Sequence, residues 1–240
     1  MSLGFGYRAR IGQLYPSGGI CDFEMQRMAP EGVQFLTTRM SFRDTSKQSD
    51  IDLVANLERD AQLLADAKVD LIAFNCTAAS LIAGPKNVCS RIEKATGIRA
   101  TTTIEAVEAA LRTLSARKIA LFTAYREDVV EAEKAYLANE GFEVVAEGHI
   151  ECLEPIAQGS LLPEAWLDLA KATDTRQCDA LLFSCAGIYI SPVIAEIETV
   201  TGKPVVTSNS ALLWHVLNEL GLPQDGVRYG KLFGIGRSKP

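Results

Sequence analysis

The chain has 240 residues, and its 24 Lys and Arg against 30 Asp and Glu give a formal net charge of −6 at pH 7. This acidic balance argues against nucleic acid or an anionic membrane as a partner, because both bind surfaces rich in Lys and Arg. No apolar run reaches the roughly 18 residues of a transmembrane helix, and the start Met1-Ser2-Leu3-Gly4 lacks the features of a signal peptide, so we expect a cytoplasmic protein.

The first half of the chain alternates between short apolar runs, typical of buried strands, and amphipathic segments, typical of helices. We expect strands over 11–15, 33–38 and 71–74, and helices over 50–68, 85–96 and 103–114. The helix over 50–68 has the strongest pattern, because Leu53, Leu57 and Leu64 recur at helical spacing. Asp50 is its expected N-cap.

The second half repeats this alternation. We expect strands over 118–122, 142–145, 180–183 and 205–206, and helices over 127–140, 163–174, 191–201 and 209–220. Strands that alternate with helices indicate βαβ units and a mostly parallel sheet. The central strands are apolar throughout, as expected when helices cover both faces of a sheet.

The two halves also resemble each other in their letters. Asp70-Leu-Ile-Ala-Phe-Asn-Cys76 matches Asp179-Ala-Leu-Leu-Phe-Ser-Cys185, and the helix ending at Gly97 matches the one ending at Gly202. We interpret this as an α/β fold of two pseudo-symmetric, doubly wound parallel-sheet lobes of the Rossmann or flavodoxin-like type, with the active site in the cleft between them. The alternative is that the repeated motif is simply the pattern of any buried parallel strand.

In an acidic chain without a signal peptide, the cysteines are expected to be free thiols. They are Cys21, Cys76, Cys89, Cys152, Cys178 and Cys185. Cys76 and Cys185 stand out because each follows an apolar strand, at the sheet edge where open α/β folds bind ligands. Two facing lobes would place these thiols on opposite sides of one cleft, which Cys21 could also approach. The others are expected to be packing residues, and with 2 His and no CxxC or HExxH motif we expect no metal site.

Hydroxyl groups and small residues surround the two thiols. Thr77 could donate a hydrogen bond to a carboxylate, and Tyr125 ends its own strand at the same edge. Backbone N–H groups of Ser17–Gly19 and Ala186-Gly187 could meet developing negative charge. The expected substrate-binding residues are Pro16, Ser17, Gly18, Gly19, Asn75, Thr77, Ala78, Tyr125, Ala186 and Gly187. Other roles stay open: a helix cap for Thr77, and an ordinary rim aromatic for Tyr125.

A family resemblance rests on the order and spacing of five segments. They are Phe74-Asn-Cys-Thr77, Leu121-Phe-Thr-Ala-Tyr125, Phe183-Ser-Cys-Ala-Gly187, Gly202-Lys-Pro-Val-Val206 and Tyr229-Gly-Lys-Leu-Phe233. Over most of its length the chain resembles the aspartate/glutamate racemase superfamily, on the branch of arylmalonate decarboxylases and maleate cis–trans isomerases. The resemblance implies two lobes around a cleft, no metal or organic cofactor, and a C-terminal segment that returns to the first lobe. The expected lobes are therefore 1–115 plus 210–240, and 116–209.

The resemblance also implies that the reaction depends on which thiols are present. Racemases and maleate isomerases carry a Cys in each half, whereas arylmalonate decarboxylases have Gly where this chain has Cys76. The chain departs from both patterns. Maleate isomerases have Pro-Ser-Ser-Asn where this chain has Pro16-Ser-Gly-Gly19, and the decarboxylases have Thr-Ser where it has Thr77-Ala78.

We therefore expect a cofactor-independent isomerase or racemase that acts beside the carboxylate of a small carboxylic or dicarboxylic acid. Cys76 would be the nucleophile or base and Cys185 the partner acid. With no Lys, Arg or His near either Cys in the sequence, backbone dipoles are expected to lower a thiol pKa. The alternatives are a decarboxylase in which Cys185 alone donates a proton, and a non-catalytic small-anion binding protein. A homo-oligomer is also among the expectations for a chain of this size.

Overall fold

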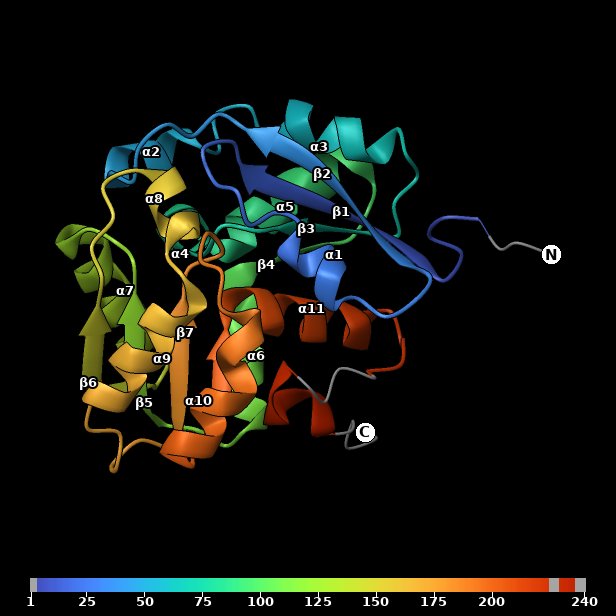
Figure 1. The fold of residues 1–240 in the computed structure, drawn as a ribbon. Helices are drawn as coiled ribbons and strands as arrows, with labels where there is room; N and C mark the ends of the chain where they lie inside the picture. The colour runs from blue at the N-terminus through green and yellow to red at the C-terminus, as the bar shows by residue number, and fades with distance from the viewer. Residues whose placement is uncertain (1–3, 225–228, 236–240) are drawn as a thin grey trace.

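The computed structural model describes residues 4–224 and 229–235. The first three residues, used above in the signal-peptide argument, and parts of the segment 210–240 lie outside this range. Two four-stranded parallel sheets form the centre of the molecule, in the orders β2-β1-β3-β4 and β6-β5-β7-β8 (Figure 1). Their strands are β1 (Ala9–Pro16), β2 (Val33–Met40), β3 (Leu71–Phe74), β4 (Ala100–Thr102), β5 (Lys118–Thr123), β6 (Glu143–His149), β7 (Ala180–Ser184) and β8 (Val205–Thr207).

The strand order confirms the pseudo-symmetry that the repeated motif predicted. The motif strands β3 and β7 occupy equivalent places, each beside the first strand of its own lobe, with Ile11 opposite Leu71 and Ile119 opposite Ala180. Both strands are buried along their whole length because helices cover the sheets on both faces. The α/β class and the two parallel sheets are therefore as expected.

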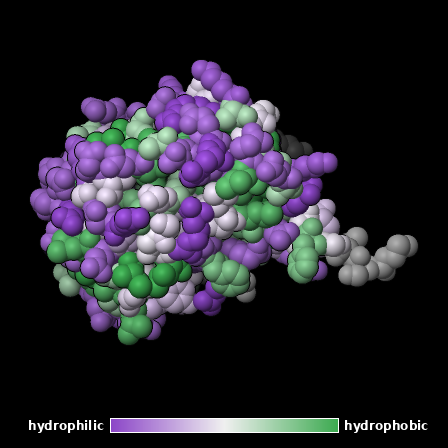
Figure 2. Space-filling view, turned by 90° about the horizontal axis from the view of Figure 1, so that it is seen from above, coloured by the Kyte–Doolittle hydropathy of each residue, from purple (hydrophilic) through white to green (hydrophobic). Residues whose placement is uncertain are grey.

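Helices fill the connections between the strands. They are α1 (Glu24–Met28), α2 (Lys47–Asp52), α3 (Leu57–Ala65), α4 (Thr77–Ala83), α5 (Pro85–Thr96), α6 (Thr103–Thr113), α7 (Glu127–Asn139), α8 (Pro155–Ser160), α9 (Pro163–Ala172), α10 (Ile194–Thr201) and α11 (Ser208–Glu219), with the 3₁₀ turns η1 (Ser191–Val193) and η3 (Lys231–Gly234). Figure 2 shows the side that carries α2 and α3 as mostly hydrophilic, with hydrophobic atoms in separate patches.

The equivalent helices α6 and α11 join the two lobes. Each follows the last strand of its sheet and begins with a capping box, built on Thr102 in α6 and on Thr207 in α11. The two helices pack against each other. Their buried faces, including Val107 and Val216, belong to one hydrophobic cluster that also holds side chains of both sheets. The lobes therefore share a core.

The C-terminal part contacts both lobes. The Tyr229 hydroxyl donates to the Arg27 carbonyl at 3.3 Å, while the Lys231 N–H donates to Glu198 at 2.9 Å. The assignment of 210–240 to the first lobe, and the lobe boundaries with it, stay a prediction.

Within the described residues, no helix has the length and apolar character that crossing a membrane requires.

The helix expected over 50–68 is wrong in one respect, because a turn over 53–56 divides it into α2 and α3. Ser46 caps α2 by accepting the Ser49 N–H at 3.2 Å, so Asp50 is not the cap but an internal, buried residue. Leu53 and Leu57 are buried in one cluster on either side of the turn, so apolar spacing could not show the break. The sequence analysis also missed α1, β4, α4 and α8, which are too short for a periodic pattern.

Candidate active site

A narrow pocket lies where the carboxyl ends of β1, β3, β5 and β7 meet. Its lining residues are Tyr15, Pro16, Gly19, Phe42, Thr45, Asp50, Cys76, Thr77, Ala78, Tyr125, Pro155, Gln158, Cys185, Ala186 and Gly187. The cavity volume is about 30 Å³. A larger groove of about 810 Å³ lies beside β2 and contains neither Cys76 nor Cys185, so the smaller cavity is the candidate site.

The two thiols occupy equivalent positions in this pocket. Cys76 follows β3 at the N-cap position of α4, close to the Ala79 N–H of the first helical turn. Cys185 follows β7, where its sulfur accepts the Gly187 N–H at 3.2 Å and lies near the Tyr125 side chain. Both thiols are buried. The structure thus brings together the two cysteines that the sequence singled out.

The protonation of these thiols differs from the expectation. Burial raises the pKa of Cys76 well above its usual value and that of Cys185 to about 12. The nearby polar groups of Ala79, Gly187 and Tyr125 lower the thiol pKa values but do not outweigh desolvation. Both thiols are therefore neutral at pH 7, and a reaction through a thiolate needs a proton acceptor nearby.

A carboxyl group that the sequence analysis did not assign to the site lies beside Cys76. The Asp50 side chain reaches the pocket from α2, and the Cys76 sulfur lies 3.9 Å from its Oδ1 as a donor. Burial, with repulsion from Asp128, raises the Asp50 pKa to about 8. A signal for this was present in the sequence: Asp50 precedes Leu53 and Leu57 by three and seven residues, on the face expected to be buried.

An amide occupies the corresponding place beside Cys185. Gln158, on α8, accepts from the Cys185 sulfur at 3.5 Å and donates to the Ala124 carbonyl at 3.2 Å. α8 follows β6 as α2 follows β2, so Asp50 and Gln158 hold equivalent positions in the two lobes. The sequence analysis did not identify Gln158, because α8 is only 6 residues long.

A hydroxyl bridge connects the two cysteine-bearing loops. The Thr77 and Ser208 oxygens lie 2.7 Å apart, and the Ser208 oxygen accepts the Cys185 N–H at 3.0 Å. Thr77 is the first residue of α4, and Cys76 occupies the cap position that had been left open for it. Ser208 was not predicted; its place at the start of α11, after the last strand of a parallel sheet, was the available signal.

Behind Cys185 lies a buried chain of polar groups. The Ser184 hydroxyl donates to Glu133 Oε1, whereas Glu133 Oε2 has no partner among the described residues. The Tyr125 side chain lies near both Ser184 and Cys185, and each of these neighbours affects or is affected in its pKa by the tyrosine. Burial raises the Glu133 pKa to about 7. Tyr125 is thus part of the site's polar network and not an ordinary rim aromatic.

The first loop takes part differently from the expectation. Pro16 and Gly19 line the pocket, whereas Ser17 is exposed and neither it nor Gly18 lines the cavity. The Ser17 N–H donates to the Met40 carbonyl at 2.7 Å, and the Gly19 N–H donates to the Pro16 carbonyl at 3.1 Å. These two N–H groups are used inside the protein, so their expected role as anion donors is wrong.

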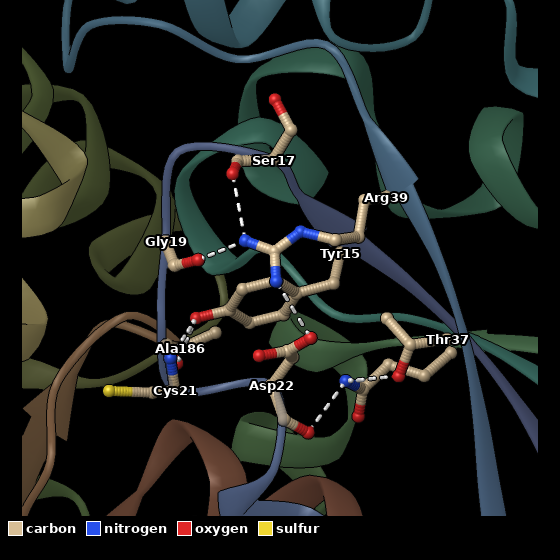
Figure 3. Close-up of polar contacts among 9 residues, drawn as sticks. Tyr15, Ser17, Gly19, Cys21, Asp22, Thr37, Arg39 and Ala186 are labelled. Carbon is tan, nitrogen blue, oxygen red and sulfur yellow. Dashed lines mark hydrogen bonds and ion pairs between the residues drawn. The ribbon is translucent and has the colours of Figure 1, made fainter.

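The loop is held from its outer side by Arg39 (Figure 3). The guanidinium group donates to the carbonyl of Ser17 at 2.8 Å and to that of Gly19, and it forms an ion pair with Asp22 at 3.0 Å. It also lies 6.0 Å from the centre of the Tyr15 ring. The loop carbonyls therefore point toward Arg39 and away from the pocket.

Tyr15 and Cys21 connect this loop to the second lobe. The Tyr15 hydroxyl donates to the Ala186 carbonyl at 3.4 Å and accepts the Cys21 N–H at 3.1 Å (Figure 3). The Cys21 thiol donates to the Gly187 carbonyl at 3.2 Å, so Cys21 does approach the cleft. Ala186 and Gly187 line the pocket, as does Ala78.

Asn75 lies behind the pocket. It is fully buried, donates to Asn209 at 3.2 Å and accepts from Thr103 at 3.1 Å. Asn209 in turn donates to the buried carboxylate of Glu24 at 2.6 Å. Asn75 therefore supports the lobe junction and does not line the cavity.

Within the part of the chain that the structure describes, no group of His, Cys, Asp and Glu side chains is arranged to hold a metal ion.

Comparison with known proteins places this pocket in context. The family model described as arylmalonate decarboxylase matches residues 12–233. The maleate isomerase of Pseudomonas putida is 28% identical over 230 residues, which cover 89% of this chain and 92% of the relative. The arylmalonate decarboxylase of Bordetella bronchiseptica is 26% identical over 230 residues, covering 91% and 93%. A solved variant of Nocardia farcinica maleate cis–trans isomerase with a covalently bound succinylcysteine intermediate superposes with a TM-score of 0.89 at 26% identity, covering 95% of this chain and 99% of that chain.

Proposed function

Because the chain belongs to the arylmalonate decarboxylase family, we propose that it is a cofactor-independent isomerase that acts beside the carboxylate of a small unsaturated acid. The observation that carries this proposal is the pair of thiols, Cys76 and Cys185, that line one pocket. The similar maleate isomerases support cis–trans isomerisation, and the succinylcysteine in the N. farcinica variant supports covalent addition of a thiol.

The reaction would begin at the double bond. The Cys76 thiol gives its proton to a base in the pocket, and its sulfur forms a C–S bond to one alkene carbon while the displaced electron pair moves toward the carboxylate. Cys185 donates a proton to the carbon beside that carboxylate, which leaves a freely rotating single bond. After rotation, Cys185 takes a proton back, the C–S bond breaks, the trans double bond forms, and the base returns its proton to Cys76, so that no atom is gained or lost.

The hydroxyl groups would stabilise the charge that accumulates on the carboxylate. Thr77 and Tyr125 line the pocket beside the thiols, and both can donate hydrogen bonds to oxygen. Preorganised donors of this kind usually supply the largest catalytic contribution, and the loss of one typically lowers turnover by about 10²–10³. Ser208, bonded to both cysteine-bearing loops, would fix the position of Thr77 relative to Cys185.

The test is proton NMR in D₂O with maleate, its monoamide and a set of aryl- and alkylmalonates. We expect the trans isomer of an unsaturated acid to appear, and Cys76→Ser and Cys185→Ser each to abolish its formation. Cys89→Ser is the matched control, because Cys89 lies on α5 and does not line the pocket. An unchanged rate of isomerisation in either pocket variant would contradict the proposed roles.

A decarboxylase is the second candidate, supported by the family and by the B. bronchiseptica relative. In that case Cys185 alone would donate a proton to the carbanion that remains after CO₂ leaves. Loss of CO₂ from a malonate, at a rate that Cys76→Gly leaves unchanged, would favour this reaction over isomerisation.

A further inference from the structure

Asp50 has no structural duty that explains its burial. Ser46 already caps α2, and Asp50 is only 2% exposed inside an otherwise apolar and hydroxyl-lined pocket. Among the described residues that line the pocket, it is the one carboxyl group. A buried carboxyl without a cationic partner destabilises a fold, and such groups in clefts are candidates for chemistry.

The charged groups around Asp50 do not neutralise it. Asp128 from α7 and Asp44 from the loop before α2 repel its negative form, and Cys76 from the start of α4 donates to it. Arg126, at the N-cap of α7, donates to the Thr45 hydroxyl at 3.3 Å, and Asp50 forms no ion pair among the described residues. The neighbour that the Asp50 carboxyl acts on is therefore the Cys76 thiol.

We propose that Asp50 is the proton acceptor for Cys76 in the reaction. As the sulfur adds to the substrate, the S–H bond breaks and an O–H bond forms on the Asp50 carboxylate; the same proton returns when the C–S bond breaks. No electron is gained or lost overall. The addition of the sulfur to a substrate rests on the function proposed above. The proton transfer from Cys76 to Asp50 does not depend on that function.

The environment of Asp50 suits this task. An ordinary, exposed aspartate is too weak a base to take a proton from a thiol. Burial raises the pKa of Asp50 to about 8, which reduces the difference from the pKa of Cys76, itself raised by burial. The sulfur-to-oxygen separation of 3.9 Å is long, but catalytic hydrogen bonds often tighten only in the reacting complex.

The second lobe provides an internal comparison. Gln158, at the position equivalent to Asp50, accepts from Cys185 but is an amide and cannot take up a proton near neutral pH. The direct hydrogen-bond acceptor of the Cys76 thiol is therefore a carboxyl group, whereas that of the Cys185 thiol is an amide. This difference assigns deprotonation to Cys76 and leaves Cys185 to act in its protonated form.

The change in Cys76 reactivity on removal of Asp50 has opposite signs for proton transfer and for a purely electrostatic effect. The negative charge of Asp50 by itself raises the Cys76 pKa, so its removal should make the thiol more reactive. If Asp50 instead takes the proton during attack, its removal should make the thiol less reactive.

The experiment measures the rate at which acrylamide alkylates Cys76 between about pH 7 and pH 9.5, by mass spectrometry of the Cys76 peptide. Acrylamide is neutral and reacts by the same addition to a double bond. In Asp50→Asn we expect alkylation to be slower by on the order of 10² at pH 8.5, with no inflection near pH 8. Asp52→Asn, an exposed change on the same helix, should behave as wild type, and Cys89 in the same samples serves as an internal reference.

Unchanged or faster alkylation of Cys76 in Asp50→Asn would overturn the proposal. Faster alkylation of the buried Cys178 in the same sample would reveal that Asp50→Asn has a folding defect. In that case Asp50→Glu is measured in place of Asp50→Asn. Retention of the inflection near pH 8 in Asp50→Glu supports the proposal, and loss of the inflection overturns it. If alkylation follows the expectation while no acid is turned over, the proton acceptor stands and the proposed function falls.

Discussion

The protein should lose stability between about pH 5 and pH 8, and replacing Glu133 by Gln should make this loss much smaller. The Glu133 carboxyl is fully buried and receives one hydrogen bond from Ser184, and its second oxygen has no partner within the part of the chain that the structure describes. Burial raises its pKa from 4.5 to about 7, whereas in the unfolded chain it ionises near 4.5. Its stabilising effect is therefore complete below pH 4.5 and is lost as the pH rises through 7. At 1.36 kcal/mol per pH unit, the loss amounts to about 3 kcal/mol.

The assay is unfolding in guanidinium chloride, followed by circular dichroism at pH 5 and at pH 8. The decrease in unfolding free energy between these two pH values should be about 2.5 kcal/mol smaller in Glu133→Gln than in wild type, because part of the full effect is already lost at pH 5. Ionisation of Asp50 also lowers the unfolding free energy in this pH range, but its contribution is the same in both proteins and cancels in the comparison. Glu131→Gln, an exposed change on the same helix, should leave the pH dependence unaltered. An equal pH dependence in wild type and Glu133→Gln would contradict this prediction, because it would mean that Glu133 ionises in the folded state at its ordinary pKa.

Three further substitutions test the site and the core around it. Ser208→Ala removes the hydroxyl that contacts Thr77 and accepts the Cys185 N–H. We expect kcat to fall about tenfold, because a fixed donor loses its support, and denaturant titration to show a loss of about 1–3 kcal/mol. Gly19→Ala places a Cβ 2.7 Å from the Tyr15 hydroxyl, so the loop must move; stability should drop by about 1–3 kcal/mol, and an unaltered denaturation midpoint would contradict this. Phe183→Ala removes a fully buried ring that lies 4.5 Å and 6.1 Å from two aromatic neighbours, and denaturant titration should show a loss of about 3–5 kcal/mol.

The parts of the fold that were predictable from the sequence are those whose pattern is local and long. β3 and β7 are apolar throughout, and the letters that surround them repeat, so the two lobes and the positions of Cys76 and Cys185 followed from the sequence. The break between α2 and α3 did not follow, because buried leucines continue across it with helical spacing. Short elements such as α4 and α8 contain too few residues to show a period.

The parts of the site that were not predictable depend on contacts between distant segments. Asp50 lies 26 residues before the thiol it contacts, and Ser208 lies 131 residues after Thr77. Whether the N–H groups of the Ser17–Gly19 loop are free to bind an anion could not be predicted either, because the Ser17 N–H is taken up by the Met40 carbonyl on the neighbouring strand β2. Backbone groups near a ligand edge are available only if tertiary structure leaves them unpaired.

The packing of α6 against α11 has a consequence for the history of the fold. It is the geometry in which two copies of a single ancestral lobe could share one core and one cleft as a symmetric pair. In such a pair both thiols would have identical neighbours, and neither could be dedicated to giving or to taking a proton. Fusion into one chain frees the copies to diverge, and the carboxyl of Asp50 opposite the amide of Gln158 is such a divergence. A duplicated architecture thereby acquires a directed proton path.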